Sequence, residues 1–240
     1  MTLTPIIEVD DLTYAYPDGR VALEGVSFRV GPGERVALVG PNGSGKSTLL
    51  LSLIGVLRAQ RGIIRVGGLA LADDTLGRIR ALAGLAFQNP DDQLFSPFVS
   101  QDVAFGPLHM GLSRAEIEAR VARALAAVGM DAYADRVSYH LSIGEKKRVA
   151  LATILSMEPQ ILLLDEPSAG LDPRARRELI GLLATFAERA MLISTHDMRL
   201  ARDLCQRVVV LDGGRIAADG PADTILYDAA LMARHGLETP

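Results

Sequence analysis

The sequence predicts an α/β fold built around a mostly parallel β-sheet, and three observations support this. From residue 142 onward, stretches typical of helices alternate with short apolar stretches typical of strands. Residues 161–164 are apolar throughout and are bounded by Pro159 and two acidic residues, as expected for a parallel strand buried on both faces. Residues 35–39 form a β-rich stretch that leads through a glycine-rich loop into a further apolar stretch.

The individual strands are predicted from β-branched and apolar runs separated by turn residues. Turn signals at residues 17–19 and 31–33 divide the first part of the chain, and Asp-Gly-Gly at 212–214 predicts a hairpin. Residues 61–87 are expected to form short strands. The other expected strands are residues 6–9, 26–30, 35–39, 161–164, 191–194, 208–211 and 215–218.

Two helices are predicted from the distribution of apolar residues. The apolar stretch 49–57 after the glycine-rich loop predicts a buried helix. In residues 115–128, apolar side chains recur at intervals of four or three residues, and charged residues lie mostly off this stripe, so an amphipathic helix is expected. No repeat or long linker divides the sequence, so a single domain over residues 1–240 is predicted.

Composition and charge argue against several functional classes. The 240 residues are 49% hydrophobic and 22% charged, as in globular proteins. The net charge of −4, the 5% aromatic content and the absence of tryptophan do not favour nucleic-acid binding. The single cysteine, Cys205, excludes an intrachain disulfide and a zinc site of cysteine pairs, and fits a reducing compartment. Neither a signal peptide nor a membrane-length apolar run is visible, so action from outside the bilayer is expected.

A phosphate-binding loop is predicted between the strand 35–39 and the helix that follows. It matches the P-loop pattern in full with Gly40, Pro41, Asn42, Gly43, Ser44, Gly45, Lys46 and Ser47, and Thr48 comes next. Glycines let backbone N–H groups approach phosphate oxygens, and the helix N-terminus adds a partial positive charge. Lys46 is therefore expected to hold the β- and γ-phosphates of a nucleotide, and Ser47 to bind Mg²⁺. The strand–loop–helix context argues against the alternative, a chance glycine-rich turn.

Two acidic residues, Asp165 and Glu166, follow the predicted strand 161–164. In open α/β sheets, ligands bind at the carboxyl ends of the strands. Asp165 is expected to hold Mg²⁺, usually through water, and Glu166 to act as the general base that polarises the attacking water. The alternative is a pair of solvated acids that opens a turn before Pro167, but the P-loop upstream favours the functional interpretation.

One stretch resembles the signature motif of ABC-type ATPases, namely Leu141, Ser142, Ile143, Gly144 and Glu145. The resemblance covers nearly the whole chain in the family's motif order. It implies the ABC-ATPase form of the P-loop NTPase fold, with a mostly parallel core sheet, an N-terminal antiparallel β subdomain and an α-helical subdomain inserted at about residues 89–157. It also implies ATP and Mg²⁺ as cofactors and hydrolysis of ATP to ADP and phosphate. Ile143 stands where the family usually has glycine, which questions close backbone packing at that point.

Further residues acquire roles through the same resemblance. Tyr16 resembles the aromatic residue that stacks on adenine, Gln88 the glutamine that senses Mg²⁺ and the transmembrane partner, and His196 the histidine that contacts the γ-phosphate. Taken alone, Tyr16 would be an ordinary strand residue and His196 a residue near a helix start. The loop that would cross the dimer interface consists of Ser168, Ala169, Gly170, Leu171 and Asp172.

The signature stretch also has a local explanation. Ser142 and Glu145 are spaced as in a capping box, in which Ser142 closes a helix start and Glu145 reaches back to it. The two interpretations are compatible, because a capped helix start still directs its positive end at an anion. The next three residues, Lys146, Lys147 and Arg148, oppose the helix dipole, and we expect them to supply a positive field near a phosphate.

In the ABC family, the signature of one protomer completes the phosphate site of the other. The resemblance therefore implies two composite sites across a head-to-tail pair, which exclude water and position Glu166 on closing and reopen after hydrolysis. A homodimer is favoured over a heterodimer.

Residues 87–95, Phe-Gln-Asn-Pro-Asp-Asp-Gln-Leu-Phe, indicate a subfamily. Asn-Pro-Asp-Asp is ordinary turn chemistry, but the whole stretch resembles the energy-coupling-factor branch of ABC importers, which take up vitamins and transition-metal ions. There a short helix extends the glutamine loop and meets a shared transmembrane protein. Residues 141–148 and 235–238 resemble the cobalt/nickel members more than the vitamin members. The dispersed histidines do not indicate a cargo site on this chain, so cargo choice is expected on a separate subunit.

The leading hypothesis is an ATPase that energises an energy-coupling-factor importer for cobalt or nickel from the cytoplasmic face of the cell membrane. Its expected partners are a second ATPase protomer, a transmembrane coupling protein and a membrane-embedded substrate-binding subunit, without nucleic acid. The alternatives are the ATPase of a vitamin importer of this branch or of another ABC transporter. The rival from another class is a soluble ABC ATPase acting on DNA, chromosomes or ribosomes, but the coiled-coil insertion, zinc modules or second ATPase domain typical of that class are not visible in the sequence.

Overall fold

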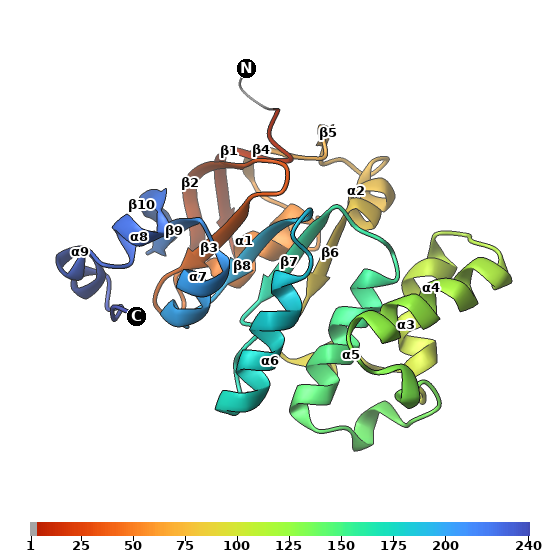
Figure 1. Ribbon diagram of the computed structural model, residues 1–240. Coiled ribbons are helices and arrows are strands. Elements are labelled where there is room, and N and C mark those ends of the chain that lie inside the picture. The colour runs from red at the N-terminus through yellow and green to blue at the C-terminus, as the bar shows by residue number, and fades with distance from the viewer. Residues whose placement is uncertain (1–3) are drawn as a thin grey trace.

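The computed structural model describes residues 4–240, which form two β-sheets surrounded by helices (Figure 1). The larger sheet has the strand order β10-β9-β3-β8-β7-β6. All neighbours from β9 to β6 pair in parallel, and only β10 pairs antiparallel, as the hairpin partner of β9. The strands are β3 (Arg35–Val39), β6 (Ala83–Ala86), β7 (Ile161–Asp165), β8 (Ala190–Ser194), β9 (Arg207–Asp212) and β10 (Arg215–Pro221). The predicted mostly parallel sheet and its hairpin are confirmed.

The smaller sheet is antiparallel throughout and has the strand order β2-β1-β4-β5. Its strands are β1 (Ile7–Ala15), β2 (Val21–Val30), β4 (Arg61–Val66) and β5 (Leu69–Ala70). It contains the N-terminal strands, as the ABC-type fold implies. The described helices do not include one long and apolar enough to cross a membrane.

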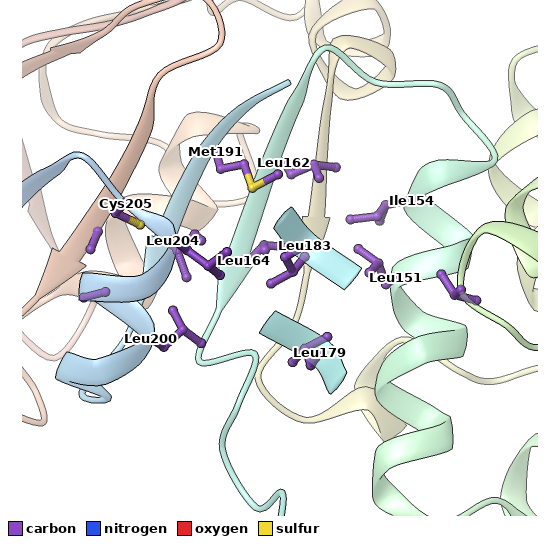
Figure 2. Close-up of a cluster of buried hydrophobic side chains, with 14 of the residues drawn as sticks. Leu151, Ile154, Leu162, Leu164, Leu179, Leu183, Met191, Leu200, Leu204 and Cys205 are labelled. Carbon is purple, nitrogen blue, oxygen red and sulfur yellow. The ribbon is translucent and has the colours of Figure 1, made fainter. Parts of the chain in front are cut away.

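Two apolar cores lie on opposite faces of the parallel sheet because side chains of a strand alternate between its faces. In β7, Leu163 belongs to the core shared with α1 (Lys46–Leu53) and the small sheet. Leu162 and Leu164 belong to the core on the other face, where Figure 2 shows them beside Leu179 and Leu183 of α6 (Pro173–Ala184). Burial on both faces explains why all five residues of β7 are buried.

Three helices form the inserted helical part, which lies to one side of the parallel sheet in Figure 1. They are α3 (Val99–His109), α4 (Arg114–Ala127) and α5 (Ile143–Leu155), which pack against one another. Their residues Val103, Leu125 and Val149 belong to the same core as Leu162 and Leu164. The other helices are α2 (Leu76–Leu82), α7 (Met198–Leu204), α8 (Ala222–Ile225) and α9 (Ala229–Arg234), with short 3₁₀ turns at Pro90–Asp92, Asp131–Tyr133 and Ser138–His140.

Several predicted bounds were wrong for identifiable reasons. Strand β1 continues past residue 9 to Ala15. A β-bulge at Asp11, whose φ is 53°, keeps the two acidic residues Asp10 and Asp11 within the strand. The helix expected over 49–57 begins at Lys46, within the P-loop, and ends before Gly55, whose φ is 65°. The expectation of strands throughout 61–87 missed α2, a helix too short for its apolar spacing to be recognised.

Cys205 is buried beside α7, and burial raises the pKa of its thiol to about 12, an effect that Arg35 offsets only in part. We therefore expect the folded protein to resist alkylation at about pH 8.5, where about half of the thiol groups of an unfolded cysteine are ionised and reactive. Iodoacetamide labelling followed by mass spectrometry, with and without guanidinium, measures this. Rapid labelling of the folded protein would contradict the burial of this thiol.

Candidate functional site

The P-loop connects the end of β3 to the start of α1 and requires glycine at two points. A Cβ on Gly40 would lie 1.9 Å from the carbonyl oxygen of Leu211, so no side chain fits there. Gly45 has φ 107°, and a Cβ would lie 2.4 Å from the carbonyl oxygen of Ala22. Both glycines allow the loop to lie against neighbouring strands, and α1 begins directly after Gly45 with Lys46.

Lys46 is buried, and its ammonium group closes the loop. Its Nζ donates hydrogen bonds to the carbonyl oxygens of Gly40 at 2.8 Å and Pro41 at 3.1 Å. Burial lowers the pKa of Lys46, and the carboxylates of Glu166 and Asp165 counteract this shift. The positive charge of Lys46 therefore lies within the P-loop, and the two nearby carboxylates favour this charged form.

A cavity of about 350 Å³ lies against this loop and is large enough for part of a nucleotide. Thirteen residues line it: Tyr16, Arg20, Val21, Ala22, Asn42, Gly43, Gly45, Lys46, Ser47, Thr48, Gln88, Glu166 and His196. Most of the residues predicted to bind nucleotide thus share one cavity with the three predicted catalytic residues. Of the other predicted loop residues, Gly40 and Pro41 supply the carbonyls that hold Lys46, and the buried hydroxyl of Ser44 has no hydrogen-bond partner among the described residues.

Tyr16 lines the cavity and contacts two of the other lining residues. Its hydroxyl lies 3.0 Å from Thr48 Oγ1, in the first turn of α1. The guanidinium of Arg20 lies over its ring, 4.7 Å from the ring centre. Arg20 was not predicted as a site residue, because it follows an exposed turn and carries no motif signal.

The carboxyl ends of β7 and β8 place the two acids and the histidine together. The hydroxyl of Ser194 donates to Asp165, while the N–H of Glu166 donates to the carbonyl of Ser194 at 3.0 Å. His196 Nδ1 lies 2.8 Å from Glu166 Oε2, which also accepts the backbone N–H of His196 at 3.2 Å. Glu166 is only 5% exposed and has φ 45°, a conformation rare for residues other than glycine. A buried carboxylate held in this way can act as a base on a water in the cavity.

The signature residues do not line this cavity and lie at the start of α5. Ser142 caps α5, with its N–H 2.8 Å from Glu145 Oε2 and its Oγ 3.4 Å from the N–H of Glu145, so the predicted capping box is confirmed. Hydrogen bonds from Ser142, and then from Tyr133, lower the pKa of Glu145. Ile143, which stands where the family usually has glycine, is 43% exposed.

The predicted interface loop 168–172 lies beside the start of α5. A Cβ on Gly144 would lie 3.8 Å from the side chain of Leu171, and Asp172 caps α6 by accepting the N–H groups of Arg174 and Ala175. The loop and the signature thus share a surface outside the cavity.

Each of the three cations after the signature has a partner within the chain, and their expected field near a phosphate stays a prediction. Lys146 pairs with Asp91 at 2.7 Å, and Arg148 pairs with Glu178 at 2.7 Å. Lys147 donates to two backbone carbonyls and is buried.

Comparison with known proteins identifies the family. The model of the ABC transporter family matches residues 23–169, which include the P-loop, the signature and both acids. The chain belongs to the ABC transporter ATPase family. As a member of this family, it is an ATP-binding, ATP-hydrolysing subunit of a transporter.

Several relatives of this ABC ATPase are similar over almost its full length. A provisionally named ABC transporter ATP-binding protein from Gloeobacter violaceus is 53% identical and covers 99% of this chain and 98% of its own. The energy-coupling factor transporter ATP-binding protein EcfA of Methanothermobacter thermautotrophicus is 47% identical, over 98% of this chain and 77% of its own. The structure of CbiO1 from Clostridium perfringens, part of the ABC transporter complex CbiONQ, has a TM-score of 0.84 and 37% identity, covering 96% of this chain and 94% of its own.

Proposed function

We propose that this ABC ATPase energises an importer of the energy-coupling-factor type, with cobalt or nickel as cargo, from the cytoplasmic face of the membrane. An apolar groove beside the Gln88 loop carries the proposal, because it offers a place for a membrane partner next to the nucleotide cavity. The likeness to EcfA supports the energy-coupling-factor type, and the likeness to CbiO1 supports a transporter with further subunits. The metal cargo rests on the resemblance of residues 141–148 and 235–238 to the cobalt/nickel members.

The groove has a volume of about 570 Å³ and lies between α2, β6, α3 and α5. Phe95 and Phe105 contribute to its lining and are 65% and 44% exposed, with their rings stacked edge to face at 4.9 Å. Exposed aromatic side chains around an apolar hollow mark a surface that a partner covers. A short helix of a transmembrane coupling protein fits this shape, since an amphipathic helix places its apolar face in such a groove.

The groove and the nucleotide cavity are joined by the loop that contains Gln88. This loop carries the 3₁₀ turn Pro90–Asp92, which supports the short helix expected of the energy-coupling-factor branch. Gln93 binds it to α5, accepting the N–H of Phe87 at 3.1 Å and donating to the carbonyl of Ala150 at 2.9 Å. We infer that the helical subdomain spans about residues 89–157 and moves with this loop.

In the proposed reaction, Lys46 and the N–H groups of the P-loop bind the phosphates, and Tyr16 stacks on the adenine. Glu166 removes a proton from the attacking water, and His196 holds the Glu166 carboxylate and contacts the γ-phosphate. Ser142 and Gly144 of a second copy complete the site, since the first copy leaves these residues outside its own cavity. The ATP-binding cassette MJ0796 forms a dimer in a post-hydrolysis state with ADP and phosphate, at 26% identity and a TM-score of 0.81.

The residues present fit a Mg²⁺ ion. Ser47, Gln88 and Asp165 offer only oxygen ligands, which Mg²⁺ prefers. Residues 4–240 contain no group of three or more His, Cys, Asp or Glu side chains placed to hold a metal, and Mg²⁺ typically relies on waters and phosphates instead. When bound, the ion would neutralise charge that develops on the phosphates.

Uptake measurements test the proposed function. A strain without this chain should lose uptake of labelled Co²⁺ or Ni²⁺ and retain vitamin uptake. Loss of vitamin uptake instead would favour the vitamin branch. Recovery of nucleic acid or ribosomes rather than a polytopic protein from solubilised membranes would favour the soluble ABC ATPases.

Replacing Phe105 with aspartate should remove the proposed partner from the purified complex, because a charge in the apolar groove is costly to bury. Co-purification of the polytopic protein from detergent extracts measures this. Tyr227→Asp is the matched control, since Tyr227 is 55% exposed and follows α8, which lies far from α3 in Figure 1. Equal recovery of the partner with both variants would contradict the assignment of the groove.

A further inference from the structure

Lys147 joins three segments of the site, although it lines no part of the nucleotide cavity. Its Nζ, from the first turns of α5, lies 3.0 Å from the carbonyl oxygen of Gln88 and 3.2 Å from that of Glu166. These are the backbone carbonyls of two residues assigned to the reaction. One ammonium group therefore connects the signature helix to the Gln88 loop and to the end of β7.

The cost of burying this charge argues against simple packing. Lys147 is only 7% exposed, and burial lowers its pKa, an effect that the carboxylates of Glu166 and Asp165 partly offset. An apolar side chain of the same length would fill the space without that cost. What the ammonium adds is two directed, charge-assisted hydrogen bonds to carbonyl groups.

Lys147 binds the backbone of Glu166, a residue whose conformation must be stabilised by its neighbours. Glu166 has φ 45°, which costs about 1–3 kcal/mol unless the surroundings hold it. Its N–H is bound by Ser194, its carboxylate by His196, and its carbonyl by Lys147 and by the N–H of Ala169 at 3.1 Å. The contact of Lys147 is the one that reaches Glu166 from the signature helix.

We propose that Lys147 is a positioning residue that sets the orientation of Glu166 and Gln88 according to the position of the signature helix. Closure of the second copy on Ser142 then acts on the base of the same chain through α5. This inference rests on the proposed roles of Glu166 and Gln88.

The test replaces Lys147 with methionine, which keeps the length and removes the donors. We expect kcat for ATP hydrolysis by the purified chain to fall about 10- to 100-fold, as for a misplaced catalytic group, with ATP affinity unchanged. Lys147→Gln retains an amide donor and should recover part of this loss. Should the methionine variant fail to fold, Lys147→Leu, which also lacks the donors, decides, and a wild-type kcat in it would overturn the inference.

The matched control is Ser156→Ala, at the C-cap of the same helix. Ser156 is also buried and donates to a backbone carbonyl, that of Val103 at 2.8 Å, but it contacts neither loop. It should lower the melting temperature and leave kcat unchanged. A Lys147→Met variant that behaves like this control would show a merely structural role.

A double variant separates this inference from the proposed function. In a Glu166→Gln background, Lys147→Met should reduce hydrolysis by a smaller factor than in the wild type, because one of the two residues that it positions is already inactive. If Glu166→Gln itself hydrolyses ATP normally, the proposed role of Glu166 fails. If Glu166→Gln is inactive while Lys147→Met keeps its kcat, only the role of Lys147 fails.

Discussion

Replacing Glu166 with glutamine is expected to lower kcat for ATP hydrolysis by about 10²- to 10⁴-fold, the usual contribution of a general base. Glutamine keeps the shape of the side chain but cannot accept the proton of the attacking water. The buried carboxylate has His196 Nδ1 at 2.8 Å and lines the same cavity as Lys46, so it is placed for this role. Phosphate release by the purified protein measures the loss.

The same variant should still bind ATP, because Lys46 and the P-loop are untouched. If two copies close on the nucleotide, ATP should hold the variant as a dimer that elutes earlier on size exclusion than the ATP-free protein. Phosphate release at the wild-type rate would contradict the assignment of the base.

Glu158→Gln is a control for the Glu166 variant. Glu158 also has a positive φ, 56°, but it is paired with Arg120 and Arg123 away from the cavity. It should hydrolyse ATP like the wild type. A fall in kcat equal to that of Glu166→Gln would show that replacing any glutamate with a positive φ lowers ATP hydrolysis, whether or not it lies in the cavity.

Lys46→Met is expected to weaken ATP binding by about 10- to 100-fold, the value of charge-assisted hydrogen bonds to an anion. Its ammonium now donates to the carbonyls of Gly40 and Pro41 and would turn to the phosphates. Methionine fills the same space without a charge, so the loop should keep its shape. Displacement of a fluorescent nucleotide measures the dissociation constant.

Arg35→Met is the matched control for Lys46→Met. Arg35 is similarly buried, at the other end of β3, and donates to the carbonyl of Ala184 at 3.1 Å. Loss of this cation should lower stability and leave ATP affinity unchanged. Equal losses of affinity in both variants would show that Lys46 acts only through folding.

Much of the site could be predicted because its motifs are contiguous. The P-loop is a local structure in which glycines and the helix start carry the chemistry, so its pattern predicts its geometry. The Ser142–Glu145 capping box is likewise a local contact, and it was found where its spacing placed it. The resemblance to ABC ATPases supplied Tyr16, Gln88 and His196, which have no local pattern of this strength.

Other parts depend on contacts between distant residues. The strand order β3-β8-β7-β6 brings Lys46, Gln88, Glu166 and His196 to one edge, and parallel pairing of this kind is not encoded in any single stretch. The position of Arg20 in the cavity and the groove around Phe105 could not be predicted either, because each depends on residues that are distant in the sequence. The ion pairs of Lys146 with Asp91 and of Arg148 with Glu178 also join residues that are distant in the sequence.

The sequence by itself determined the nucleotide chemistry, the capped signature helix and the alternation that makes a parallel sheet, because each arises from neighbouring residues. Only the tertiary structure decided that Glu166 takes a positive φ and that Lys147 lies between two carbonyl groups. Where a buried ammonium finds its partners depends on which backbone carbonyls long-range packing leaves beside it.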